Sequence, residues 1–136
     1  MTNLDFFKAY FNNELNATFD IIAAMPADKL DYKPHPINRT AYEIAEHIVA
    51  HVVDLDIIIN NNQCDEKLTH SFTTPSELAE EMRSHWERAQ QSLEKLSADQ
   101  WENEPVELLI NSKSFITLPR MHMMWFFHND IIHHRG

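Results

Sequence analysis

Glycine and cysteine are almost absent from this chain of 136 residues, which contains one of each. The one glycine is the last residue, Gly136, so the sequence has no glycine-rich loop to cradle a phosphate. Sandwich and dinucleotide-binding folds need residues with positive φ in their tight turns, so the lack of glycine argues against both. Because Cys64 is alone, no internal disulfide forms, and we expect a reducing cytoplasm.

Long apolar runs and an excess of basic residues are also missing. The apolar runs, such as residues 57–59, are far shorter than the roughly 20 residues of a membrane-spanning helix. The N-terminus lacks the basic start and apolar segment of a secretory signal peptide. A formal net charge of −10 would repel phosphate backbones and anionic lipid headgroups. We therefore expect a cytoplasmic protein that binds neither nucleic acid nor membranes.

Apolar residues make up 43% of the chain, enough for one hydrophobic core of ordinary size. They recur at the helical spacing of three and four in four segments: residues 2–25, 40–60, 74–96 and 118–136. This pattern predicts a single all-α domain, residues 1–136, built as a four-helix bundle. The pattern of the last segment continues up to Gly136, so we expect a further C-terminal piece in the native protein.

Long connections separate the second helix from the third and the third from the fourth. The first connection opens with the polar residues 60–66, which predict a loop. The second contains residues 106–110 and 114–117, which are compatible with a short β-hairpin. The third helix has the clearest start, because Thr74 is a favourable N-cap residue and Pro75 suits the first helical position.

Nine histidines are the main chemical feature, and several of them fall on the second and fourth helices. Asp130 and His134 are four residues apart, so their side chains lie on one face of the fourth helix. His47, beside the apolar stripe of the second helix, is the best candidate for a third ligand. Two imidazoles and a carboxylate suit Zn, Ni, Fe(II) or Mn. Three protein ligands would leave a coordination position open, as catalytic sites do.

These residues also have an interpretation without a metal. A histidine on an apolar helix face is more often a hydrogen-bonded core residue than a ligand, and Asp130 and His134 can form a buried ion pair. His51 lies one turn after His47 and can either pair with it as an HxxxH chelate or support the ligands and line a substrate pocket. We expect His133 to support the ligands or to line the same pocket. His133 can equally face a neighbouring helix, solvent or another subunit. His85 falls at core spacing on the third helix.

Two segments resemble a known family. Residues 39–50 read RTAYEIAEHIVA, and residues 129–136 read NDIIHHRG. With the helix order between them, these segments resemble the DinB-like superfamily of metal-dependent four-helix bundles, which includes the YfiT-like proteins and usually carries HxxHHRGQ at the second place. The resemblance covers essentially the whole chain. It implies a nickel, zinc or similar divalent ion held by three histidines.

Carried over to this sequence, the family's ligand positions fall on His47, Asp130 and His134. Asp130 departs from the pattern, because a carboxylate replaces an imidazole and changes the charge and the metal preference of the site. The resemblance implies a metal-dependent enzyme of the thiol S-transferase or hydrolase type, with a small-molecule substrate and a low-molecular-weight thiol as cosubstrate. The alternative is a non-catalytic bundle or small-ligand-binding protein in which Asp130 marks a degenerate metal site.

A homodimer is the expected assembly. Members of the family commonly pair, and the fourth helix is aromatic and methionine-rich over more of its circumference than one core face requires. The residues that carry this feature are Met121, Met123, Met124, Trp125, Phe126 and Phe127. The sequence does not indicate which helices form the interface.

Overall fold

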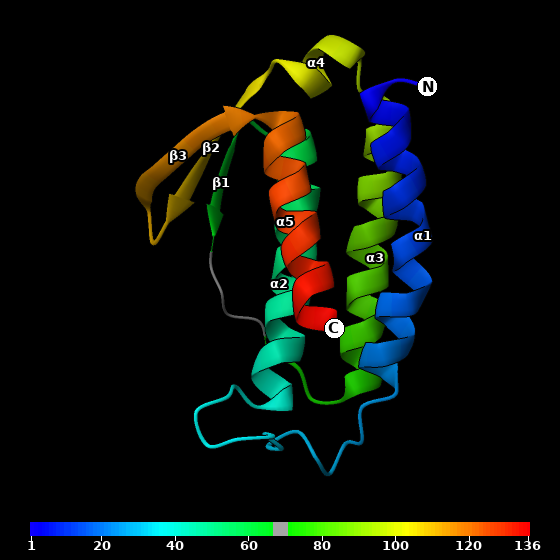
Figure 1. Ribbon diagram of the computed structural model, residues 1–136, viewed down its shortest axis with the longest axis vertical. Helices are drawn as coiled ribbons and strands as arrows, with labels where there is room; N and C mark the ends of the chain where they lie inside the picture. The colour runs from blue at the N-terminus through cyan, green and yellow to red at the C-terminus, as the bar shows by residue number, and fades with distance from the viewer. Residues whose placement is uncertain (67–70) are drawn as a thin grey trace.

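The computed structural model describes residues 1–66 and 71–136 of the chain (Figure 1). Four long helices form a bundle: α1 (Asn3–Ala23), α2 (Ala41–Asn60), α3 (Pro75–Leu93) and α5 (Arg120–Arg135). The connections hold a short helix and three strands: β1 (Gln63–Glu66), α4 (Ala98–Glu102), β2 (Pro105–Ile110) and β3 (Lys113–Pro119). The four predicted helices are therefore present, and the chain contains a short helix and three strands in addition to them.

Three of the long helices, α1, α2 and α3, begin at a side-chain cap. Thr2 Oγ1 accepts a hydrogen bond from the Asp5 backbone N–H at 3.1 Å, and the Asp5 carboxylate accepts one from the Thr2 N–H at 3.0 Å. Thr40 and Glu43 form the same reciprocal pair at the start of α2. The predicted cap Thr74 is also in place at the start of α3. Such caps satisfy N–H groups that the first turn of a helix leaves without partners.

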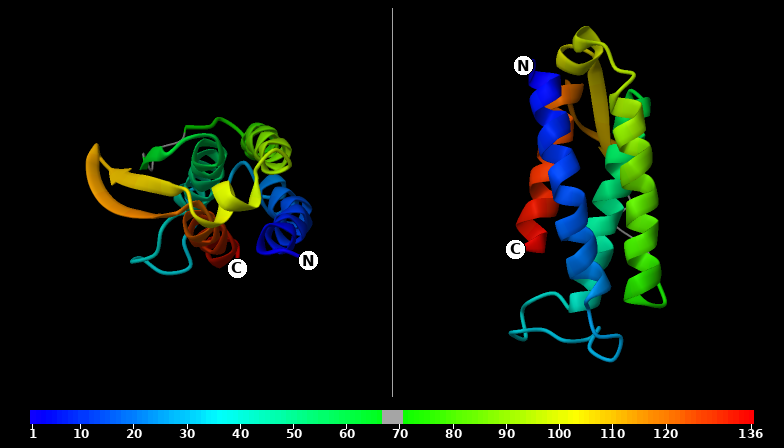
Figure 2. Two further views of the ribbon diagram at one scale, coloured as in Figure 1. Left: turned by 90° about the horizontal axis from the view of Figure 1, so that it is seen from above. Right: turned by 90° about the vertical axis from the view of Figure 1, so that its right-hand side faces the viewer.

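The four long helices surround one apolar core. Figure 2 shows these helices end-on, from above. α2 packs against both α3 and α5, whereas α1 packs mainly against α3 and less extensively against α5. The largest fully buried side chains are those of Trp86, Trp101, Phe7, Phe11 and Phe127. His85, predicted at core spacing, is only half-buried, because the neighbouring Trp86 takes the core position. No helix in the described ranges is long and apolar enough to cross a bilayer.

A three-stranded sheet beside the bundle corrects the prediction of an all-α fold. The expected hairpin is present as the antiparallel pair β2 and β3. β1, which the polar residues 60–66 predicted as loop, pairs in parallel with β2. Its first residue, Gln63, faces Glu107, which lies 44 residues later in the chain. A four-residue strand with such a distant partner has too few residues to show an alternating pattern.

The hairpin turn does without the glycine that such turns usually contain. Asn111 and Ser112 adopt φ values of 50° and 64°, in the left-handed region. Ser112 donates from its backbone N–H and its hydroxyl to the two carboxylate oxygens of Asp65, at 3.0 and 2.9 Å. These bonds fasten the turn to β1 and offset part of the cost of positive φ at residues with a Cβ atom.

A buried arginine joins the sheet end of α5 to the end of α2. Arg120 is 2% exposed, and its Nη1 donates to the carbonyl oxygens of Ile58, Ile59 and Asn61, the last at 3.0 Å. Its Nη2 donates to Glu104 Oε2 at 2.7 Å. The last carbonyls of a helix have no partner within the helix, so Arg120 caps α2 from a neighbouring element.

Candidate metal centre

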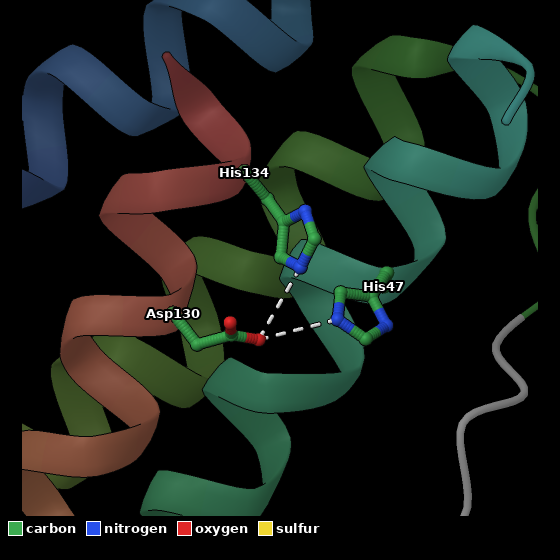
Figure 3. A group of neighbouring side chains, drawn as sticks. All are labelled: His47, Asp130 and His134. Atoms are coloured by element: carbon green, nitrogen blue, oxygen red, sulfur yellow. Dashed lines mark hydrogen bonds and ion pairs between the residues drawn. The ribbon is translucent and has the colours of Figure 1, made fainter. Parts of the chain in front are cut away.

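The three residues predicted as ligands meet between α2 and α5 (Figure 3). Asp130 Oδ2 lies 3.3 Å from His47 Nε2 and 3.4 Å from His134 Nε2. One ligand atom from each residue lies within 4.8 Å of the other two. The structure therefore brings together side chains that the sequence separates by 83 residues.

The helices explain this arrangement. α2 and α5 run in opposite directions side by side, which places the start of α2 next to the end of α5 (Figure 1). The spacing of four residues stacks Asp130 and His134 on the face of α5 that meets α2. His47 is buried, whereas Asp130 and His134 are half-buried. The cluster thus lies at the edge of the bundle, within reach of solvent.

His51, one turn after His47, is closer to Asp130 than either histidine named above. Its Nε2 lies 2.8 Å from Asp130 Oδ2. Its other ring nitrogen, Nδ1, lies 3.4 Å from Asp54 Oδ2 and 3.8 Å from Glu66 Oε1. The sequence predicted His51 either as a chelating partner of His47 or as a neighbour of the ligands, but it did not predict the two carboxylates beyond it.

The sequence contains a signal for one of these carboxylates and none for the other. Asp54 follows His51 by three residues on the apolar face of the helix, and a carboxylate buried there needs a partner. Glu66 reaches the cluster from β1, whose pairing with β2 has no sequence signature. With one atom each, His51, Asp54 and Glu66 form a second group within 4.8 Å.

Three other histidines of α5 lie outside the cluster, and one of them, His122, is exposed near the start of the helix. His133 is exposed, with its ring centroid 5.2 Å from that of His134. Its role beside the ligands stays a prediction. His128 is fully buried among aromatic rings, the nearest being those of Phe11 and Tyr10 at 5.3 and 5.4 Å. Within the described residues neither of its ring nitrogens has a hydrogen-bond partner, and burial lowers its pKa to about 4.

The electrostatics of the cluster favour the protonation states that bind metal ions. Burial lowers the pKa of His47 to about 4, and the adjacent His51 and His134 act in the same direction. Burial also lowers the pKa of His134, against the attraction of Asp130. For Asp130 burial raises the pKa, but the three imidazoles outweigh burial and hold it below its usual range. Unprotonated imidazoles beside an ionised carboxylate are the states that ligands require.

These donors fit a divalent transition ion. Imidazole nitrogens suit Zn and Ni, and an added carboxylate oxygen also suits Fe(II) and Mn. The donor atoms come from two helices and lie close enough to share one ion. The chemistry and the spacing of the donor set therefore agree with a bound metal.

Two cavities adjoin the cluster. One has a volume of about 250 Å³ and reaches His134, and its wall is mainly apolar, with Ile21, Ile22, Met25, Ile44 and Ile48. The other, of about 220 Å³, is lined by Arg39, Glu43, Glu46 and His47. Arg39 lines both cavities, and its positive charge contributes to the lowered pKa values of His47 and His134.

Comparisons with known proteins agree with this fold. The structure is similar to the crystal structure of a DinB-like protein, YjoA, from Bacillus subtilis, with a TM-score of 0.70 and 18% sequence identity. The match covers 95% of this chain and 84% of the other. No curated protein matches the sequence. The model of the DinB family matches residues 1–136, and the chain therefore belongs to the DinB family.

Proposed function

We propose that this protein is a metal-dependent enzyme of the thiol S-transferase or hydrolase type that acts on a small molecule. The observation that carries the proposal is the convergence of His47, Asp130 and His134 beside an apolar cavity of about 250 Å³. A divalent ion bound there would lower the pKa of a coordinated thiol or water molecule, so that the deprotonated nucleophile is available at neutral pH. Zinc or nickel is the expected ion, with iron and manganese next.

The chain's own residues account for the remaining requirements. His47, Asp130 and His134 hold the ion, and the charge of Asp130 neutralises one unit of it. The pKa of a thiol or water molecule at this ion is therefore lowered less than it would be at an ion held by three histidines. The apolar wall binds the apolar part of the substrate and excludes water from it. Arg39 offers a positive charge to an anionic group of the substrate or of the thiol cosubstrate.

The first test of this proposal is metal content. Protein purified without an affinity tag is loaded with Zn or Ni, and the bound metal is measured by elemental analysis. One ion per chain and a higher melting temperature are expected in the presence of the ion. A chain that takes up no stoichiometric metal, with an unchanged melting temperature, contradicts the proposal and favours a non-catalytic bundle.

The second test is catalysis by the loaded protein. A thiol such as bacillithiol, mycothiol or cysteine is offered with an alkyl chloride. In the transferase reaction the sulfur bonds to carbon, chloride leaves and the thiol proton passes to solvent. Hydrolysis of a nitrophenyl ester tests the other reaction type. His134→Ala is expected to abolish the metal-dependent rate, whereas the matched control His122→Ala, at an exposed position of the same helix, is expected to keep it.

We also propose that the protein is a homodimer in the cytoplasm. An aromatic surface formed by Phe6, Tyr10 and Trp125 crosses from α1 to α5, and the Phe6 side chain is 55% exposed. Such surfaces are typical of protein interfaces. Light scattering at micromolar concentration is expected to give twice the chain mass of 16.0 kDa. A mass near that of one chain contradicts the dimer.

A further inference from the structure

We propose that His51 is a metal ligand through Nε2, so that α2 supplies the imidazole that is missing at Asp130 on α5. This inference rests on the proposed metal centre. The Nε2 atoms of His47, His51 and His134 lie 3.3, 2.8 and 3.4 Å from one and the same atom, Asp130 Oδ2. Three imidazole nitrogens, two from α2 and one from α5, therefore surround one carboxylate oxygen.

The hydrogen-bonding capacity of His51 supports a cation at that point. A neutral imidazole has one N–H, but His51 faces carboxylates at both ring nitrogens. If Nε2 carries the proton, the lone pair of Nδ1 faces Asp54 and Glu66. If Nδ1 carries the proton, the lone pair of Nε2 faces Asp130. A cation between Nε2 and Asp130 removes the second conflict and leaves Nδ1–H to donate to Asp54.

Asp54 is placed as the partner that a metal-binding histidine needs. Histidine ligands usually donate their second ring N–H to a carboxylate or carbonyl, which fixes the tautomer and the direction of the ring. Asp54 is 5% exposed, and its Oδ2 lies 3.4 Å from His51 Nδ1. Its other oxygen accepts a hydrogen bond from Cys64 Sγ at 3.5 Å. The charges of Asp54 and Asp130 together balance those of a divalent ion.

Two competing arrangements make different predictions. In the first, His51 is an imidazolium ion that bridges Asp130 and Asp54 without touching the metal. In the second, His51, Asp54 and Glu66 hold a separate ion. The first gives two imidazoles per bound ion, and the second gives two ions per chain. The proposal gives one ion per chain with three imidazoles.

X-ray absorption spectroscopy of the nickel-loaded protein counts the imidazoles around the ion. Three imidazoles and one nickel per chain are expected. Two imidazoles around a single bound nickel overturn this inference alone and leave the proposed metal centre intact. Two nickel ions per chain overturn it in favour of separate sites. A wild-type chain that takes up no nickel overturns both the inference and the proposed function.

Variants separate a ligand from a residue that only positions Asp130. His51→Ala is expected to lower the imidazole count to two and to weaken nickel binding by more than the roughly 10- to 100-fold that loss of an outer partner costs. Asp54→Asn is expected to keep three imidazoles and to weaken binding within that range. His85→Ala is the matched control, because His85 also pairs with a carboxylate, Asp56 at 3.0 Å, but outside the cluster. It is expected to change neither quantity.

An unchanged imidazole count in His51→Ala overturns the inference. Circular dichroism checks that each variant is folded. If His51→Ala is not folded, His51→Gln replaces it, because the amide retains a polar group of similar length between Asp130 and Asp54. The count on the wild-type protein does not depend on any variant.

Discussion

Two polar clusters join α2 to α5, and they differ in how their charged and polar groups are paired. At the sheet end, both terminal nitrogens of Arg120 donate to acceptors, namely backbone carbonyls of α2 and the carboxylate of Glu104. At the other end, three imidazole nitrogens surround one oxygen of Asp130. In the first cluster the charge of Arg120 is met by protein acceptors at both terminal nitrogens, and only its buried Nε has no partner among the described residues. The second cluster has nitrogen atoms gathered around one carboxylate oxygen, where a metal ion could bind.

This difference separates a structural role from a functional one. A buried charge whose partners are all protein groups stabilises the packing of the elements that supply them, and removing it leaves those groups unsatisfied. A cluster completed by an ion contributes to stability only when the ion is present. Variants of the two clusters should therefore respond differently to added metal.

The largest expected effect is that of Arg120→Met. The substitution leaves the last carbonyls of α2 without a buried partner, so the free energy of unfolding is expected to fall by about 4 kcal/mol. Urea denaturation followed by circular dichroism measures it. The control Lys8→Met removes an exposed ion pair with Glu94 and is expected to cost less than about 1 kcal/mol. A similar small loss for Arg120→Met would show that the cluster at the sheet end is dispensable.

Acid stability depends on the buried His128, whose ring nitrogens have no hydrogen-bond partner among residues 1–66 and 71–136. Its pKa is about 4 in the folded protein against 6.5 for the free side chain, so the unfolded chain binds the proton first. Stability is therefore lost as the pH falls from 6.5 towards 4, by about 3 kcal/mol for this residue. His128→Phe should abolish that part of the loss. Unfolding curves at pH 7 and pH 4 measure it, with His122→Phe as the exposed control; equal losses in wild type and His128→Phe would refute this assignment.

Added nickel should stabilise the wild-type protein by about 2.7 kcal/mol at a concentration 100 times the dissociation constant. The gain arises because the folded chain holds the ion and the unfolded chain does not. His134→Ala is expected to lose most of this gain, whereas Arg120→Met is expected to retain it. Thermal unfolding with and without nickel measures the difference. Equal gains in His134→Ala and wild type would remove His134 from the ligand set.

The smallest effect concerns the carboxylate itself. Asp130→Ala is expected to weaken nickel binding by about tenfold, or 1.4 kcal/mol, because one charged ligand is lost. Asp130→His should retain or tighten binding, since nickel and zinc prefer imidazole. Competition with a chromophoric chelator measures both affinities. Unaltered affinity in Asp130→Ala would mean that Asp130 is only an ion-pair partner of His134.

The sequence predicted what local spacing determines. Apolar residues three and four apart marked the four long helices, and the same periodicity placed Asp130 and His134 on one face. A helical prediction also indicates which face meets the core, and this placed His47 on the inward face as a candidate ligand. These features depend on residues within two turns of one another, so no knowledge of the tertiary structure was needed.

The sequence did not predict what depends on distant partners. β1 is a strand only because β2 lies beside it, and its four residues carry no signal of their own. Glu66 reaches His51 only through that pairing. At α3 the prediction failed for a different reason: His85 and Trp86 are adjacent, and packing of the larger ring determined which of the two faces the core.

The lone cysteine provides a natural reporter of local opening. Cys64 is 1% exposed on β1, and burial, together with the negative charge of Asp54 and Glu66, raises the pKa of its thiol. A thiol reagent can therefore react with it only during moments when β1 detaches from the bundle. The labelling rate under native conditions measures the free energy of that opening at a single known position. Because the thiol donates to the carboxylate behind His51, slower labelling in the presence of an ion would show that metal binding restrains the motion of the sheet.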